Sequence, residues 1–321
     1  MSKYLLKRLG VSLVVILGVT MVIFSIIRLQ PGNPYLNMVQ YDTDPEFLEE
    51  RLTELGYYDP LPIQYFKWLG RVVKGDLGYS IHYRTPVSQL IKDRLSNTSL
   101  LAITSFIFST ILAVLIGVFS AGRSKSLWDY IITVISFIGI SIPVFFFGLL
   151  LIKFLGYDLN IVPISGMKTL GVDYTGIEKI IDIAKHMILP VFVLSITQTA
   201  SLVRYTRSSM LDVLHQDYMR TARSKGLSRG KTIWTHGFRN SLISIITVLC
   251  MRIPDLLSGA LIVETVFVWP GMGSLNYQAI LNQDYPLIMG VTLIMALIVI
   301  VCNLAADVLY ALADPRIRVG G

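Results

Sequence analysis

Long runs of apolar residues, free of Lys, Arg, Asp and Glu, dominate the chain. Five of them cover Leu9–Ile27, Thr98–Ala121, Tyr130–Ile152, Met187–Val203 and Tyr285–Ala306. A helix needs about 20 such residues to cross the hydrocarbon core of a bilayer, so the short fourth run is expected to extend by a turn at each end. A sixth run, Ser241–Val263, is interrupted only by Arg252 and Asp255. The pattern predicts an all-α integral membrane protein with six transmembrane helices.

Composition supports a membrane protein. The chain has 321 residues, of which 53% are hydrophobic and 15% charged, whereas soluble domains carry about 25% charged residues. The only cysteines, Cys250 and Cys302, lie inside apolar runs, which predicts no disulfide or metal framework. The four histidines lie on separate segments without metal-ligand spacing, so no metal site and no bound cofactor are expected.

The distribution of Lys and Arg predicts the orientation. Basic residues occur before the first run, between the second and third, between the fourth and fifth, and in the C-terminal tail. These segments alternate along the chain, and residues 264–284 contain no Lys or Arg. Basic loops stay in the cytoplasm, so both termini are expected there. The net charge of +7 is therefore explained by the basic residues that hold these loops in the cytoplasm, and nucleic-acid binding is not expected.

The spacing of the runs predicts four regions. The first run is expected to be an uncleaved signal anchor, because no small-residue cleavage site follows it. The next segment is long for a turn, contains several Pro and aromatic residues, and includes "DPEFLEERLTELG", an expected amphipathic helix ended by Gly56. The regions are a signal-anchor helix (1–29), an extracellular cap (30–97), a core transmembrane domain (98–313) with a cytoplasmic loop (204–240), and a cytoplasmic tail (314–321).

The stretch "QDYMRTARSKGLSRGKT" is the most polar part of the basic loop. Gly230, Lys231 and Thr232 match the end of a phosphate-binding loop, but the first glycine of that motif would fall at Lys225. No buried strand precedes it either. The stretch therefore predicts no nucleotide site, and no nucleotide-hydrolysing residues are recognised elsewhere.

The same stretch predicts a short helix. Asp217 is suited to the N-cap, and Gly226 to the position after the helix end. Spacing of three and four residues places Tyr218, Ala222 and Lys225 on one face. The small residues Thr221 and Ala222 would let another surface approach the backbone closely. Two interpretations follow: a basic loop at the lipid surface, or a docking helix for a cytoplasmic partner.

The longer run "YMRTARSKGLSRGKTIWTHGFRNSL" resembles the docking-loop signature of binding-protein-dependent ATP-binding cassette importers. It is most similar to the oligopeptide/dipeptide (and nickel) permease family, in particular its B-type subunits. The family signature is Glu-Ala-Ala, three residues, then Gly; Arg220-Thr221-Ala222 and Gly226 occupy these places. Further similar runs are "DPLPIQYFKWLGRVVKGDLGYS", "VETVFVWPGMGSL" and "DVLYALADPRIR". The chain departs from the family in lacking a proline soon after Asn240 and in carrying Arg252 and Asp255.

The resemblance implies a type I importer permease fold and a non-catalytic subunit that translocates peptides by alternating access. It implies a second homologous permease, two cytoplasmic ATPases that hold the ATP and Mg, and an extracellular substrate-binding protein. It assigns the ATPase-coupling helix to Asp217, Tyr218, Arg220, Thr221, Ala222, Arg223, Lys225 and Gly226. A permease for nickel or another small solute is the alternative within the family. An ATPase-independent channel or secondary carrier is the alternative of another class, and no residues converge as in a membrane enzyme.

Polar residues within the apolar runs are the candidates for the translocation path: Gln198, Arg252, Asp255 and Glu264. Arg252 and Asp255 either neutralise each other, meet a peptide, or contact the partner permease. The hydroxyls around Gln198 either join helices or line the path. Glu264 belongs either to an outer gate or to a structural turn, where it is hydrated or capping. Pro143 and Pro190 predict kinks in the third and fourth spans.

Overall fold

The structure is a computed structural model that describes residues 2–29, 53, 56–253 and 260–313. Within this part the chain is helical and contains no β-strand, apart from an isolated bridge between Tyr79 and Pro86. The all-α expectation is therefore confirmed for the described residues. The helices are α1 (Ser2–Leu29), α3 (Leu61–Val73), α4 (Val87–Gly122), α5 (Leu127–Ser141), α6 (Val144–Leu151), the π-helix η2 (Ile152–Asp158), α7 (Gly176–Leu214), α8 (Asp217–Ser224), α9 (Arg229–Lys231), the π-helix η3 (Thr232–Phe238), α10 (Arg239–Arg252), α12 (Ala260–Val266), α13 (Met272–Leu281) and α14 (Tyr285–Ala313).

Helices long and apolar enough to cross a membrane number four in the described part, and five if α5 and α6 form one broken span. The four are α1, α4, α7 and α14. The sixth apolar run divides between α10, which ends at Arg252, and α12, which begins at Ala260. Asp255 lies between them, outside the described residues. The structure thus supports a multi-spanning chain, and the six-helix count stays a prediction.

The predicted third span is not one straight helix. α5 ends at Ser141, α6 begins at Val144, and the continuous segment of α6 and η2 is bent by 100° from α5. Pro143 accounts for the break, because it lacks an N–H and disfavours helical backbone at the preceding residue. Ile142 is accordingly extended, with φ −77° and ψ 126°. Pro190, in contrast, lies inside α7, which continues unbroken for 39 residues and is much longer than predicted.

The chain divides into two compact units, and the first comprises Met1–Asn97 and Gly271–Ile300. Here Tyr65 of α3 attaches to α1 through a 3.0 Å hydrogen bond between its Oη and Thr20 Oγ1 and an edge-on contact with Phe24. The buried Asp284 accepts hydrogen bonds from Ser80 Oγ and from the backbone N–H of Leu287, which caps the start of α14. Gly56 has φ +71°, as expected for a helix stop, but most of the predicted amphipathic helix lies outside the described residues.

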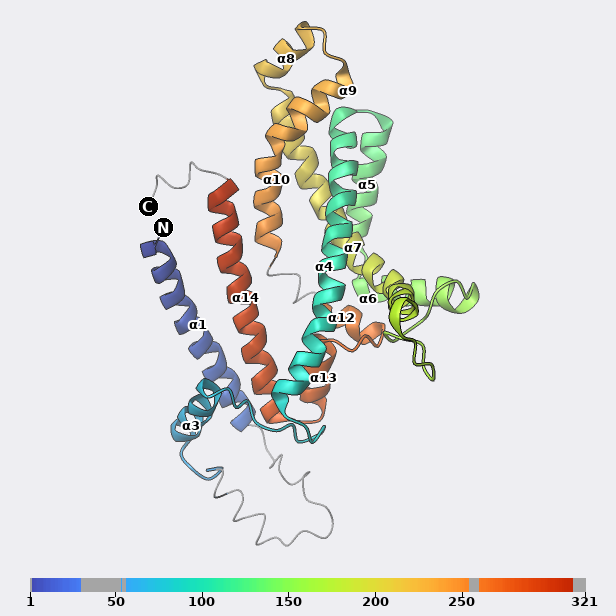
Figure 1. The fold of residues 1–321 in the computed structure, drawn as a ribbon. Coiled ribbons are helices and arrows are strands. Elements are labelled where there is room, and N and C mark those ends of the chain that lie inside the picture. The colour runs from blue at the N-terminus through green and yellow to red at the C-terminus, as the bar shows by residue number, and fades with distance from the viewer. Residues whose placement is uncertain (1, 30–52, 54–55, 254–259, 314–321) are drawn as a thin grey trace. The chain divides into compact units, whose positions relative to one another are not determined.

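The second unit comprises Thr98–Pro270 and Val301–Gly321. Helices α5 and α7 and the later part of α4 run alongside one another in this unit (Figure 1). Small residues permit the close approach. A Cβ atom at Gly117 of α4 would lie 2.6 Å from Thr206 Cβ of α7, and one at Gly139 of α5 would lie 3.3 Å from Ala200 Cβ. Such contacts pack helices tightly where lipid removes the hydrophobic driving force.

Candidate functional site

The predicted short helix is present as α8, which follows the end of α7 and precedes α9 and η3 (Figure 1). Gly226 has φ +80°, and its N–H donates to the Arg223 carbonyl at 2.9 Å, so it ends the helix as expected. The N-cap prediction was wrong by one residue. Gln216 has the extended backbone of the cap, and Asp217 lies in the first helical turn. An acidic residue in the first turn is still favourable, because it lies near the positive end of the helix dipole.

One face of α8 is buried against its own chain. Met219 is 1% exposed and Ala222 8% exposed. A Cβ atom at Gly237 of η3 would lie 3.6 Å from Met219 Cε and 3.2 Å from Met210 Cε of α7, so Met219 packs where η3 meets α7. Tyr218 and Lys225, which were predicted to share a face with Ala222, are exposed, whereas Ala222 is mostly covered by the chain itself. The contact of Ala222 with a partner stays a prediction.

The opposite face of α8 is exposed and polar. Asp217 and Arg220 form an ion pair with 3.8 Å between Oδ1 and a guanidinium nitrogen, and their side chains are 98% and 80% exposed. Thr221 and Ser224 are exposed, and their hydroxyls donate to backbone carbonyls one turn earlier. This face carries charge and hydroxyl groups but is not packed against the described chain. We call it the outer face of α8: Asp217, Arg220, Thr221 and Ser224.

The segment after α8 supports it and is helical. Ser228 caps α9 by accepting the Lys231 N–H at 3.4 Å, and the fully buried Thr232 donates back to the Ser228 carbonyl at 3.0 Å. Ser241 of α10 then contacts Met210 Sδ at 3.0 Å. Gly230, Lys231 and Thr232, the near match to a phosphate-binding loop, thus lie in helical backbone, and Thr232 is buried. Side chains of this segment hold it between α7 and α10.

A buried ion pair between Asp129 and Arg207, which the sequence did not single out, joins α4, α5 and α7. Asp129 of α5 receives two hydrogen bonds from Arg207 of α7, at 2.6 and 2.8 Å, and a third from Ser120 of α4 at 2.5 Å. The Lys125 N–H adds a fourth at 2.9 Å. The Asp129 and Arg207 side chains are 3% and 30% exposed. Sequence reasoning counted Arg207 only among the basic residues of a loop, because nothing in the sequence pairs it with Asp129.

The polar cluster around Gln198 joins α7 to α4. Ser109 of α4 donates to Gln198 Oε1 at 3.1 Å, and Ser195 donates to the Ser105 carbonyl at 3.1 Å. These contacts support the helix-packing interpretation of the hydroxyls on the fourth span. Gln198 itself is half-buried. Its place on a translocation path stays a prediction.

Glu264 is fully buried in the second unit. Thr98 Oγ1 donates to its carboxylate at 2.6 Å, and its carbonyl accepts the Trp269 N–H at 2.8 Å. Of the alternatives for Glu264, a hydrated carboxylate does not fit the described residues, because they enclose it. The outer gate and the capping role in a structural turn stay predictions. Arg252 lies half-buried in the last turn of α10, and its predicted partner Asp255 is outside the described residues. The path roles of both residues stay predictions.

Histidines and acids of the described residues form no group of three or more that could hold a metal ion. His186 of α7 instead lies beside Asp182, with 3.5 Å between Nδ1 and Oδ1. Asp182 also accepts hydrogen bonds from the Thr169 N–H at 2.9 Å and hydroxyl at 2.6 Å. These contacts fasten the connection before α7 to that helix. The role that the structure gives them is structural.

The whole chain is similar to known permeases. Residues 113–319 match the family described as binding-protein-dependent transport system inner membrane component, and residues 1–102 match its N-terminal family. The oligopeptide transport system permease protein AppB of Bacillus subtilis is 44% identical over 99% of this chain and 100% of its own. The dipeptide permease protein DppB of Escherichia coli K12 is 36% identical, and the di/tripeptide DppB of Pseudomonas aeruginosa 37%, each over 99% of both chains. The chain therefore belongs to the family of binding-protein-dependent transport system inner membrane components and is a multi-pass membrane protein.

Proposed function

We propose that this chain is a permease subunit of an ATP-driven importer of peptides. Relatives named for oligopeptide, dipeptide and di/tripeptide transport match it from end to end. In this proposal the chain is not catalytic. Two cytoplasmic ATPases bind ATP and Mg, a second homologous permease completes the path, and an extracellular binding protein delivers the peptide.

The observation that carries the proposal is the two-sided character of α8. Its inner side chains, Met219 and Ala222, are buried against the chain, whereas its outer face is polar and exposed. A helix fixed on one side and free on the other can receive a partner and transmit its displacement. Met219 lies at the position where η3 meets α7, so motion of α8 reaches the long helices through packed side chains rather than through a loose loop.

The orientation belongs to the same proposal. In this proposal α8, both termini and the turn between α4 and α5 lie in the cytoplasm, and the basic residues of these segments support that orientation. This orientation requires six spans. They are α1, α4, the bent α5–α6 pair, α7, the α10–α12 region and α14. Closing of the ATPases would then move α8 and open the path outward, and opening would return the path to face inward.

Thr221→Glu tests the coupling role of α8. Thr221 is exposed on the outer face, so the substitution leaves Met219 and Ala222 in place. A carboxylate buried without a partner in the ATPase interface costs about 3 kcal/mol, which corresponds to roughly a hundredfold weaker ATPase binding. The intact assembly would be purified in detergent, ATPase retention measured, and peptide-stimulated ATP hydrolysis measured in liposomes with the binding protein present.

Thr235→Glu is the matched control, because Thr235 is an exposed threonine of η3. We expect this variant to retain the ATPases. If Thr221→Glu retained the ATPases as well as Thr235→Glu does, the outer face of α8 would not be the coupling surface. Peptide uptake by the chain without ATPases would favour an autonomous channel or carrier instead.

A further inference from the structure

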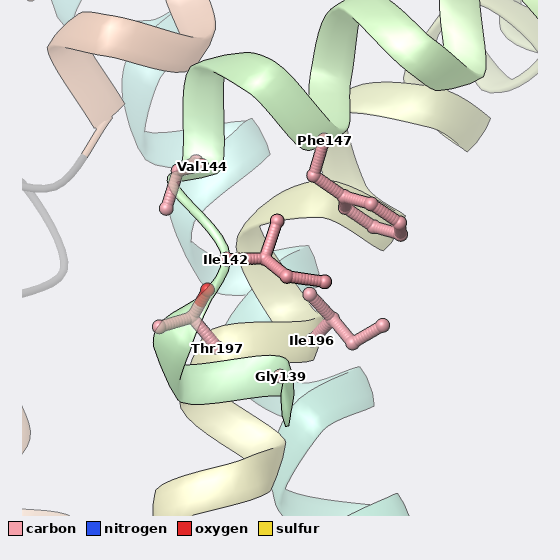
Figure 2. A pocket seen from close by; sticks show the side chains of 6 residues that line it. All are labelled: Gly139, Ile142, Val144, Phe147, Ile196 and Thr197. Atoms are coloured by element: carbon pink, nitrogen blue, oxygen red, sulfur yellow. The ribbon is translucent and has the colours of Figure 1, made fainter. Parts of the chain in front are cut away.

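An apolar groove runs along the second unit between α4, α5 and α7. Its volume is about 890 Å³, comparable to sites for small organic ligands. Large apolar side chains along it are exposed, including Phe108, Leu115 and Ile135. The described part of the chain therefore leaves the groove uncovered. At the bend between α5 and α6, Ile142, Phe147 and Ile196 point toward the same space and close a small adjoining pocket of about 20 Å³ (Figure 2).

The hydroxyl groups along the apolar length of the groove already donate hydrogen bonds within and between the helices. Its hydroxyl groups belong to Ser136, Ser195 and Thr199. Each already donates to a backbone carbonyl, namely that of Ile132, Ser105 and Ser109 respectively. A peptide in this groove would leave its amides without partners, which is costly away from water. An acyl chain needs no such partners, so the chemistry of the lining selects hydrocarbon.

One end of the groove is cationic. Arg123, in the turn after α4, is the only charged residue among the described residues that line the groove, and it lies over the Phe119 ring at 4.1 Å. Phe119 and Arg123 also line a second pocket, of about 320 Å³, together with Arg229 and Trp234. The Arg229 guanidinium is held in place by donating to the Gly122 carbonyl. Two guanidinium groups and an indole thus surround the space at the end of the apolar groove.

We propose that the groove binds one anionic phospholipid, with an acyl chain between α4, α5 and α7 and the phosphate between Arg123 and Arg229. Arg matches phosphate geometry through paired N–H donors. Basic pockets between membrane helices on the cytoplasmic side are suited to anionic headgroups. Trp128 and Trp234 lie at the same end, as aromatic residues do at the membrane surface. The inference rests on the cytoplasmic orientation of the α4–α5 turn proposed above.

Photolabelling tests the site in the intact assembly. The assembly would be placed in nanodiscs of phosphatidylethanolamine containing phosphatidylglycerol with a photoreactive group on its acyl chain. After illumination, labelled peptides would be mapped by mass spectrometry. We expect labels concentrated on the groove faces of α4 and α5. Arg123→Gln and Arg229→Gln should each reduce labelling about fivefold, because each removes one cation near an anionic phosphate.

Two matched controls isolate the groove. Lys231→Gln removes a neighbouring exposed cation that lines neither pocket, and it should leave labelling unchanged. Ile135→Trp fills the groove and should abolish labelling, whereas Ile131→Trp alters the same helix outside the groove lining and should not. Labelling that is uniform over the lipid-facing helices, or equal in the arginine variants and the native chain, would overturn the proposal.

A helix of the second permease is the competing occupant. Ile135→Cys paired with cysteines in that subunit would then form a disulfide in high yield, and groove labelling would be absent in the native assembly. That result would refute the lipid site. It would leave peptide import untouched, because uptake and ATP hydrolysis are measured separately, with the same assembly reconstituted in liposomes.

Discussion

Two Asp–Arg pairs in the second unit have the same chemistry and opposite surroundings. Asp129 and Arg207 make two hydrogen bonds of 2.6 and 2.8 Å between separate helices, with side chains 3% and 30% exposed. Asp217 and Arg220 lie on one short helix, 3.8 Å apart, and are 98% and 80% exposed. The first pair is held in one geometry by its neighbours. The second is surrounded by solvent.

The difference separates a structural role from a recognition role. A buried pair is costly to break, because removal of one partner leaves a charge without compensation. An exposed pair contributes about 0–1 kcal/mol and leaves its hydrogen-bonding groups available to another protein. Helices α4, α5 and α7 are therefore joined by Asp129, whereas α8 offers its charges outward. The predictions below test this contrast on stability and on ATPase binding.

Arg207→Ala should give the largest loss of stability. It leaves Asp129 buried with only Ser120 and the Lys125 N–H, at an expected cost of about 3–5 kcal/mol. The midpoint of thermal unfolding of the detergent-purified assembly measures the loss. Arg204→Ala is the control, because Arg204 stacks on Phe137 in an exposed position and should cost less than about 1 kcal/mol. Equal midpoints for the two variants would contradict the structural role of the buried pair.

Met219→Ala should have the next largest effect. It removes the side chain that seats α8 where η3 meets α7, with an expected local cost of about 2–4 kcal/mol. Hydrogen exchange in α8 should accelerate, and peptide-stimulated ATP hydrolysis should fall while the long helices remain protected. Met251→Ala, at an exposed position of α10, should change neither. Unaltered exchange in α8 would show that the helix does not depend on this contact.

Ser120→Ala should have a smaller effect on the buried pair. It removes one hydrogen bond of 2.5 Å to a carboxylate that retains its other donors, at an expected cost of about 1.5–3 kcal/mol. The unfolding midpoint should therefore fall less than in Arg207→Ala. Ser224→Ala serves as the control, since that hydroxyl is exposed and bonds only its own helix. A larger loss at Ser120 than at Arg207 would reverse the assigned order of contributions.

Arg220→Ala should have the smallest effect on stability, under about 0.5 kcal/mol, because its ion pair is exposed. ATPase binding should nevertheless weaken by about fivefold, as expected for loss of a polar interface contact of about 1 kcal/mol. Thermal unfolding and ATPase retention on the same preparation separate the two effects. If Arg220→Ala lowered the unfolding midpoint but retained the ATPases, Arg220 would have the structural role that we assign to Arg207 and no role in recognition.

Sequence patterns were reliable where a local signal suffices. The spacing between Asp217 and Gly226 predicted α8, because a helix start and a glycine stop depend on neighbouring residues. The same pattern did not indicate that Ala222 is mostly covered by the chain itself, because the burial of a small residue depends on what lies across from it. Pro143 signalled a break in the third span, but the 100° angle of the bend depends on how α6 packs afterwards.

The amino-acid sequence by itself determined the all-α membrane class, most of the apolar segments, the short polar helix and the family. These follow from hydropathy, local caps and residue identity, which need no knowledge of distant neighbours. Only the tertiary structure decided that Arg207 pairs with Asp129, that Glu264 is enclosed beside Thr98, and that α8 turns Met219 inward. Each of these contacts joins residues that are far apart in the chain or lie on different helices. The free energy of each contact depends on how deeply it is buried, and a local sequence pattern does not report burial by distant residues.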